Sequence, residues 1–515
     1  MSTSGSRTKQ VLKAMVAELI FQILSVLFPF VIRSIFIIKF GRDYVGLNSL
    51  CTSILSTLNL IELGMDASFK YKMFKPMAEK DWDKVGSILN YIKSVYFVIG
   101  LIIMGLGGIL MPFLPVLIKS GTPSGINVYV VFGGYLLQQV LGYFYNNYLR
   151  TAFIADQQKH KISIFQSVTF MFVYIVQTVV ILEGKYYLYI VSLVLFPIVM
   201  GFLLGREFKK CYPKIDVNGK LENDIKGEIW RETTAVAVFR LRTASRDTFD
   251  NIIISALLGL AILADYNNYI LISALPCFLC KLVAVSVGPS LGNFQVHNSK
   301  KEIYRIYRLS LLLQLFFSAL MCVCYYSLAQ NFIIVWIGEE YILDRSVAAL
   351  TAYQIFFRGI SEFTTMLRES LGIWNKGRYS ALCEMLSNLV LNIVFTKFWG
   401  LNGIIIATIV TIVLFNVPTD MMNIIREHLN EKVAWSHAII INVVIGATLG
   451  TYLSECIMGL WGIQNGWISL GIRAFICLVV SSFTMIICLI PVRDFRQLLM
   501  EGYRYFIRVR KDGDI

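Results

Sequence analysis

The chain has few charged residues for its size. Of its 515 residues 16% are charged and 56% are hydrophobic. A soluble domain carries about 25% charged residues, and a soluble chain of this length would divide into several domains that each need a polar surface. The sequence instead returns to apolar runs of about 20 residues, the length that crosses a bilayer's hydrocarbon. We therefore predict an all-α polytopic membrane protein.

The sequence also lacks the usual signatures of catalysis. It contains no GxxxxGK[ST] phosphate-binding loop, and its longest hydrophilic connector, 206–232, is short and basic. The four histidines fall in connectors or at helix ends, and Cys277 and Cys280 lie in an apolar run without a second pair. These positions argue against a metal site. We predict that the protein is not an enzyme, needs no cofactor and does not hydrolyse ATP.

The apolar runs predict about 14 transmembrane helices. We place them at 12–38, 44–66, 87–115, 126–149, 160–182, 185–205, 230–258, 264–292, 306–329, 344–368, 378–397, 401–425, 436–457 and 467–491. The net charge of +14 gathers in alternate connectors, above all in 206–231 and in the tail after 492. Lysine and arginine favour the cytoplasmic side, so both termini are predicted to be cytoplasmic. Because the cations do not share one soluble face, nucleic acid is not expected as a partner.

The hydrophilic connector divides the spans into two sets of similar size. We predict an N-terminal lobe at 1–205, a cytoplasmic linker at 206–229, a C-terminal lobe at 230–425, two extra helices within 426–491, and a basic amphipathic tail at 492–515. A short repeat supports two lobes, because Phe40-Gly41 and Leu258-Gly259 each lie between the first two spans of their lobe. Secondary transporters are commonly built from such repeats.

Several spans carry charged side chains. A charge at the bilayer centre costs roughly 2.5–3.5 kcal/mol on insertion scales, so it normally faces the protein interior or a water-filled cavity. Since both lobes contribute such residues, we predict a shared, cationic central cavity, and arginine suits a phosphate-bearing headgroup there because it donates two parallel hydrogen bonds. The candidate substrate-binding residues are Arg33, Glu62, Arg240, Arg246, Asp250, Lys281, Arg358 and Glu362.

Other roles remain open for these residues. Arg33 and Arg240 lie toward the ends of their spans, where long side chains reach the headgroups. Glu62 has an alternative role as the structural partner of an arginine in its lobe. Ion pairs that only hold helices together are the alternative for the others, and polar residues such as Asn388 are expected to support helix packing.

Three stretches of the N-terminal lobe carry a family resemblance. Residues 40–50 (FGRDYVGLNSL), 54–64 (ILSTLNLIELG) and 74–78 (FKPMA) follow one another closely. The first two resemble the span 1–2 signature of Wzx-type polysaccharide flippases, and the third is similar to that family's Y-x-P-x-A region, with Phe74 in place of tyrosine. The sequence departs from the pattern at Asp66, Lys70 and Lys72, where such proteins are usually less charged. The layout matches the multidrug/oligosaccharidyl-lipid/polysaccharide (MOP) exporter superfamily over nearly the whole chain.

The resemblance implies a fold and a function. The fold would be MATE-like, with two six-helix lobes and two extra C-terminal helices around a V-shaped cavity that opens to one side at a time. The activity would be the movement of an undecaprenyl-diphosphate-linked oligosaccharide repeat unit to the outer leaflet of the bacterial cytoplasmic membrane for surface polysaccharide synthesis. The partners would be that lipid-linked substrate, membrane lipids, and a polysaccharide polymerase with other assembly proteins.

Three other functions are weighed against this one. A lipid II or teichoic-acid precursor flippase would share the mechanism and differ in the headgroup. A cation-coupled multidrug exporter of the same superfamily would need an acidic cavity, which the arginines and lysines of the second lobe disfavour. A membrane glycosyltransferase or ligase would need a catalytic loop or domain larger than any connector of this chain.

The predicted topology has a direct test by cysteine labelling. In a variant without native cysteines, Asn465→Cys should react with an impermeant thiol reagent in whole cells, because residue 465 is expected outside. Asn218→Cys should stay protected, since 206–229 is expected to be cytoplasmic. Labelling at position 218, or protection at 465, would overturn this part of the layout.

Overall fold

The computed structural model describes residues 28–500 apart from 63, 120, 296, 374–376 and 461–465. Within helices, the side chains at 61, 232, 234–240, 242–245, 247, 289 and 378 also lie outside the described part. Contacts divide the chain into two compact units, Met1–Ala264 and Asp265–Ile515, called here the first and the second unit. Each is described by itself.

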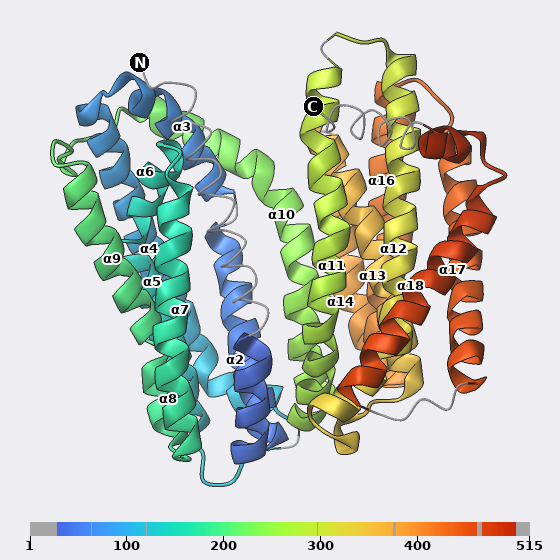
Figure 1. Cartoon of the computed structure of the whole chain (residues 1–515). Helices are drawn as coiled ribbons and strands as arrows, with labels where there is room; N and C mark the ends of the chain where they lie inside the picture. Colours follow the sequence, from blue (N-terminus) through green and yellow to red (C-terminus); the bar gives the residue numbers. More distant parts are fainter. Residues whose placement is uncertain are drawn as a thin grey trace, which may run out of the picture. The chain divides into compact units, whose positions relative to one another are not determined.

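The first unit is a bundle of helices (Figure 1). Its longer helices are α2 (Arg42–Leu58), α4 (Trp82–Leu110), α5 (Val128–Phe144), α7 (Lys159–Leu182), α9 (Leu195–Cys211) and α10 (Asn223–Leu257). Its shorter ones are η1 (Asn59–Glu62), α3 (Met65–Glu79), η2 (Met111–Leu117), η3 (Asn147–Leu149), α6 (Arg150–Ala155) and α8 (Tyr186–Ser192). Residues 28–40, at the end of the first predicted span, are also helical.

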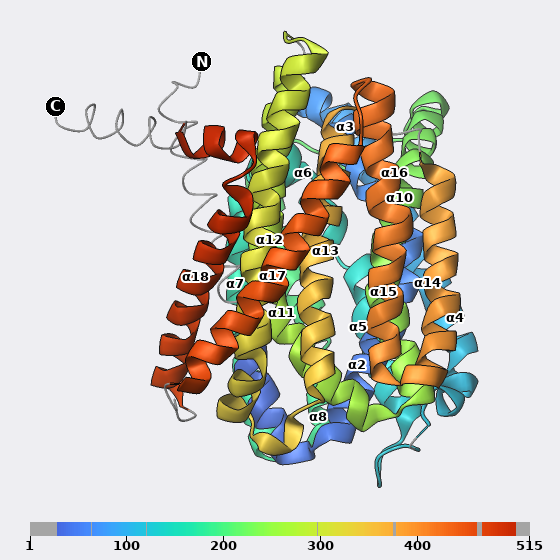
Figure 2. The same cartoon turned by 90° about the vertical axis from the view of Figure 1, so that its right-hand side faces the viewer.

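The second unit is also a helical bundle, in which α12, α17 and α18 pack together (Figure 2). Its helices are α11 (Leu260–Phe294, which starts in the first unit), α12 (Lys300–Trp336), η4 (Glu339–Tyr341), α13 (Arg345–Ser370), α14 (Arg378–Trp399), α15 (Leu401–Thr411), η5 (Ile412–Asn416), α16 (Val417–Met421), η6 (Met422–His428), α17 (Ala434–Leu460) and α18 (Trp467–Leu489).

Every predicted span coincides with helical structure, the first one over its described residues only. Within the described ranges, nine helices are long and apolar enough to cross a membrane. Helices are expected here because hydrocarbon offers no partner to a free backbone N–H or C=O group, and a helix satisfies these groups internally. Polar residues set some helix starts: Asp81 accepts a hydrogen bond from the backbone of Lys84, and Ser299 forms a reciprocal capping box with Glu302.

Two short helices were not predicted from the sequence. Helix α3 follows the second span, and Gly64, in the left-handed region at φ 90°, forms the turn before it. Helix α6 follows the fourth span. Both are too short or too polar to resemble spans, and such segments were expected to be connectors.

Helix α10 packs against α2 and α3 of the first unit. Asn251 donates to the hydroxyl of Ser53 at 2.9 Å, and Lys72 forms an ion pair with Glu228 at 2.6 Å. The hydrogen bond from Lys72 lowers the pKa of Glu228. By contacts α10 therefore groups with the helices before it, whereas the sequence placed it at the start of the C-terminal lobe. The functional lobes at 1–205 and 230–425, with the linker at 206–229, stay predictions.

The sequence repeat has a structural counterpart. Gly41 and Gly259 both adopt positive φ angles, 87° and 105°, directly before α2 and α11. Glycine favours this region because it has no Cβ. The two elements also touch: a Cβ on Gly46 would lie 2.1 Å from the carbonyl oxygen of Leu260.

Two other predictions fall partly outside the described residues. The basic tail at 492–515 is helical over 493–500, and its remainder lies beyond the described part, as does Asn465.

The close contact at Gly46 predicts a stability effect. Gly46→Ala should destabilise the first unit by about 1–3 kcal/mol, because the added methyl overlaps the backbone at Leu260. Gly105→Ala is the matched control, since Gly105 is also helical and a Cβ there meets no atom within 4 Å. Size-exclusion profiles of detergent-solubilised protein after heating would measure both. Equal melting of Gly46→Ala and the wild type would contradict the close approach.

Candidate functional site

Glu62 lines a polar cavity of about 280 Å³ inside the first unit. Asn59, Asp66, Lys70, Tyr96 and Arg150 also line it. Glu62 is the last residue of η1, and Asp66 lies in the first turn of α3. The turn at Gly64 between them brings both side chains to the same cavity. Acidic and basic side chains therefore share this space.

Hydrogen bonds within the first unit orient Glu62. The hydroxyl of Tyr143 donates to Glu62 at 2.6 Å and lies 3.2 Å from the side-chain oxygen of Asn59. Asp66 is paired with Lys70 one turn later on α3. Glu62 thus has a tyrosine partner from α5, and its predicted contact with substrate stays a prediction.

A second cavity, of about 230 Å³, adjoins the first one. Asn147 and Arg150 line both cavities, and Gln138, Tyr145, Gln166 and Phe196 are among the other residues of the second. We call this second cavity the Arg150 pocket. Arg150 was not among the candidate residues predicted from the sequence.

Arg33 and two residues of α10 also lie in the first unit. Arg33 donates to the backbone carbonyl of Ala264 at 3.0 Å, so its guanidinium contacts protein backbone. Arg246 and Asp250 lie one turn apart on α10. Both side chains are buried, with 5% and 3% of their surface exposed. Both charges therefore face the interior of the protein, as is expected of charged residues within a membrane-spanning helix. The side chain of Arg240 lies outside the described part.

The remaining candidates lie in the second unit. Arg358 and Glu362 are half-buried and one turn apart on α13, whereas Lys281 is exposed on α11. Whether these residues share a cavity with those of the first unit stays a prediction.

The second unit contains a buried ion pair that was not predicted. Nε of Arg368 lies 3.1 Å from Oδ1 of Asp420, and both side chains are fully buried, at 0% and 1% exposure. Thr365 donates to the other oxygen of Asp420 at 3.2 Å, and Arg368 donates to the carbonyl of Ile373 at 3.3 Å. Arg368 and Asp420 were not among the candidate residues predicted from the sequence. The acidic Asp420 within the apolar run 401–425 was the available signal.

The backbone around Asp420 is irregular. Helix α16, which carries Asp420, lies between the π-helical segments η5 and η6. Such turns are rare and frequently occur at functional sites. Nearby, Asn388 of α14 donates to Thr408 and Thr411, at 3.4 Å each, as expected of a residue that holds two helices together.

Comparison with known proteins gives structural matches only. No family model and no curated protein matches the sequence. The structure is similar to the lipid II flippase MurJ in an inward closed conformation, with a TM-score of 0.69, 14% identity, and coverage of 93% of this chain and 99% of that one. It is also similar to an inward-facing multidrug resistance MATE family transporter, with a TM-score of 0.62, 12% identity, and coverage of 81% and 98%.

A third match is a MOP superfamily transporter from Pyrococcus furiosus, whose binding pocket is described as having reversed polarity. Its TM-score is 0.52 at 12% identity, with coverage of 82% of this chain and 97% of that one. The chain is therefore an all-helical polytopic membrane protein with the MOP, or MATE-like, fold. The matched proteins are a flippase and transporters.

The buried pair predicts a stability effect in the second unit. Asp420→Asn should destabilise the protein by about 3–5 kcal/mol, because it leaves the Arg368 charge buried without its counter-ion. Glu79→Gln breaks the exposed Lys75–Glu79 pair and should cost less than about 1 kcal/mol. Thermal melting of the purified protein would compare the two.

A double variant completes this test. Replacing both members with apolar residues, Arg368→Met with Asp420→Leu, should recover most of the lost stability, since neither charge then remains buried. Wild-type melting of Asp420→Asn alone would show that the pair does not stabilise the second unit.

Proposed function

We propose that this chain is a MOP-type flippase that moves an undecaprenyl-diphosphate-linked oligosaccharide repeat unit from the inner to the outer leaflet of a bacterial cytoplasmic membrane. It would work by alternating access, with the sugar–diphosphate headgroup in a cationic cavity and the polyprenyl tail in lipid. The repeat unit would then serve the synthesis of a capsule, an exopolysaccharide or O-antigen.

The match to MurJ carries this proposal. It covers 93% of this chain, whereas the MATE transporter covers 81%. MurJ is described as a lipid II flippase, so the more extensive match favours a lipid-linked substrate over a free drug. The Wzx-like residues at 40–50, 54–64 and 74–78 favour an oligosaccharide headgroup.

The charged residues inside the helices support the same function. Arg246 is buried on α10, and Arg358 is half-buried on α13. A guanidinium group in a water-excluded or confined site binds phosphate more strongly than it does in bulk water, because the local dielectric is lower. We assign these two arginines to the diphosphate, with Arg33, Arg240 and Lys281 as further cations of the cavity.

The acidic candidates would have a different role. Glu62, Asp250 and Glu362 would balance the charge of the arginines and keep the cavity from holding its anionic substrate too tightly. Release requires binding that is not too strong, as in other membrane pathways. The cytoplasmic orientation of both termini and the association with a polysaccharide polymerase belong to this proposal as well.

A lipid II or teichoic-acid precursor flippase is the second candidate. The similarity to MurJ favours it specifically, since that protein is a lipid II flippase. The mechanism would be the same, and only the headgroup in the cavity would differ. A cation-coupled multidrug exporter is the third candidate, which the MATE match supports over a smaller part of the chain.

Two substitutions test the role of the arginines. Arg246→Ala and Arg358→Ala should each abolish surface polymer while the protein still inserts, because each removes a ligand of the diphosphate. Lys220→Ala and Lys397→Ala are the matched controls, since both lysines are exposed and make no ion pair in the described part of the chain. Normal surface polymer in both arginine variants would reject these residues as headgroup ligands.

A charge exchange separates binding from structural pairing. If Arg246 only neutralises Asp250, the double variant Arg246→Asp with Asp250→Arg should keep the wild-type protein level and restore the transport that Arg246→Ala loses. If Arg246 binds the headgroup from its own position, the exchange should keep the protein level, but transport should stay lost. Immunoblots of the membrane fraction beside assays of surface polysaccharide would distinguish the two results.

A further inference from the structure

The Arg150 pocket is built where a membrane helix breaks. Helix α5 ends at Phe144, Tyr145 is extended, and Asn146 adopts a positive φ of 59° before the chain resumes as η3 and α6. Irregular backbone in a membrane protein is tolerated where it is buried in protein or lines an aqueous cavity, and transporters use such breaks to form binding sites. The break sets Tyr145, Asn147 and Arg150 on the pocket wall.

Two glycines of α9 accommodate the broken segment. A Cβ on Gly201 would lie 2.2 Å from the ring of Tyr145, and a Cβ on Gly205, one turn later, would lie 2.7 Å from the side-chain nitrogen of Asn146. That nitrogen donates to the carbonyl of Gly201 at 3.1 Å. Glycine at these two positions of α9 thus allows the broken segment to pack closely against that helix, as small residues do at helix contacts in membranes.

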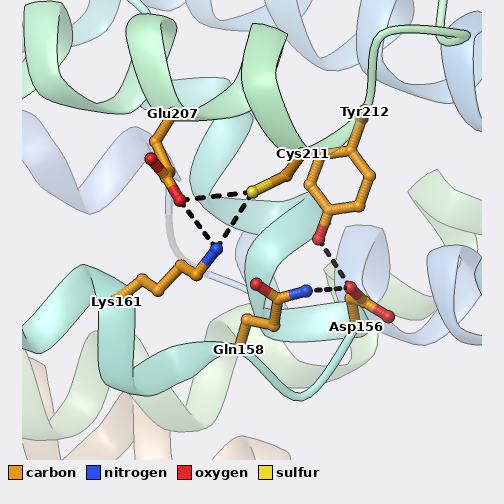
Figure 3. Close-up of polar contacts among 6 residues, drawn as sticks. All are labelled: Asp156, Gln158, Lys161, Glu207, Cys211 and Tyr212. Atoms are coloured by element: carbon orange, nitrogen blue, oxygen red, sulfur yellow. Dashed lines mark hydrogen bonds and ion pairs between the residues drawn. The ribbon is translucent and has the colours of Figure 1, made fainter.

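Figure 3 shows a polar cluster beside the pocket, on helices α6, α7 and α9, which also supply residues of the pocket lining. Lys161 at the start of α7 contacts Glu207 of α9 at 2.7 Å and Cys211 at 2.9 Å. At the end of α6, Asp156 accepts a hydrogen bond from Tyr212 at 2.7 Å. These contacts tie α6, α7 and α9 together. A site whose walls are already fixed loses less free energy to ordering when it binds a ligand.

Arg150 gives the pocket its charge. It is the one lysine, arginine, aspartate or glutamate that lines this pocket, and it is half-buried. Within the described part of the chain, Arg150 makes no ion pair and no side-chain hydrogen bond. The amides of Gln138 and Gln166 also make no hydrogen bond there. One cation and two amide groups are thus available to a ligand.

The remaining walls are aromatic and apolar. Tyr145 and Phe196 line the pocket beside Pro197, Met200 and Leu204. Amide groups pair with hydroxyls, a guanidinium group pairs with phosphate or carboxylate, and an apolar wall covers the C–H face of a ring. Pockets for drug-sized ligands measure about 300–1,000 Å³, so a volume of about 230 Å³ suits a smaller ligand.

We infer that the Arg150 pocket binds a single acidic sugar, that is, one sugar ring that carries a phosphate or a carboxylate. Arg150 holds the anionic group, Gln138 and Gln166 hold ring hydroxyls, and the apolar wall packs against the ring. None of the eight candidate cavity residues lines this pocket. It is therefore lined by a different set of residues, although it adjoins the cavity that Glu62 lines and shares Asn147 and Arg150 with it.

The source of the sugar is a separate question. The same chemistry occurs in the headgroup of a lipid-linked sugar and in a free sugar phosphate. A lipid-linked source rests on the proposed function, whereas the chemistry of the pocket does not.

The test is a binding measurement on the full-length protein in lipid nanodiscs. Glucose 1-phosphate, as the free probe, and a short-chain polyprenyl-diphosphate-linked glucose, as the lipid probe, are titrated separately. Arg150→Gln should weaken binding of at least one probe tenfold or more, because a charge-assisted hydrogen bond is lost. Loss for both probes, or for the free probe alone, assigns a site open to soluble sugars. Loss for the lipid probe alone assigns the lipid-linked source.

Two further variants show whether a loss of binding comes from the pocket itself. Arg206→Gln removes an exposed arginine of α9 that does not line the pocket, and it should bind both probes like the wild type. Gln166→Leu should weaken binding severalfold without a change of charge, so the result does not depend on a single variant. Each variant is used only after its melting temperature is shown to match that of the wild type.

Two results would overturn the inference. One is wild-type affinity of both probes in Arg150→Gln and Gln166→Leu. The other is equally tight binding of neutral glucose, which would remove the role of the anionic group. If deletion of the gene leaves lipid-linked sugar pools unchanged while Arg150→Gln still weakens the binding of glucose 1-phosphate, the pocket stands and the flippase proposal fails.

Discussion

Hydrocarbon offers no hydrogen-bond partner, and this constraint governs both the fold and the position of the buried charges. The backbone satisfies it by forming helices, and several charged side chains satisfy it by contacting protein groups. Arg368 forms an ion pair with Asp420 in the second unit. In the first unit, Glu62 accepts a hydrogen bond from the hydroxyl of Tyr143, and Arg33 donates one to a backbone carbonyl. The charges are therefore part of the architecture as well as candidates for binding.

The same constraint implies that irregular backbone within the membrane must be buried in protein or line a cavity. The α5–η3–α6 break leaves the backbone at Asn146 outside a regular helix. The break packs against the glycines of α9, and Asn147 and Arg150 after it line two cavities. In the second unit, π-helical turns flank Asp420. Each unit thus combines regular apolar helices with polar, irregular segments. In the proposed transport function, the regular helices would hold the protein in the membrane, and the irregular regions would provide contacts for a polar ligand.

The sequence predicted the spans well because a run of about 20 apolar residues has few alternatives in a membrane protein. It did not predict α3 or α6, since short polar helices beside a membrane have no distinct pattern. Arg150 was not a candidate because an arginine after an apolar run usually reports topology alone. Asp420 and Arg368 are far apart in the sequence, so only the packing of α13 against α16 revealed their pairing. Gly41 and Gly259, which the short repeat places at equivalent positions, both adopt a positive φ before a helix, whereas the two lobes that the repeat supported stay a prediction.

The most direct test of the account is the pool of lipid-linked sugars in cells that lack this gene. Undecaprenyl-linked sugars are measured by mass spectrometry beside the surface polysaccharide. The account predicts that lipid-linked repeat units accumulate while the surface polymer is lost, and the mass of the accumulated species would identify the headgroup. Unchanged lipid-linked pools would contradict the flippase function and favour the multidrug exporter.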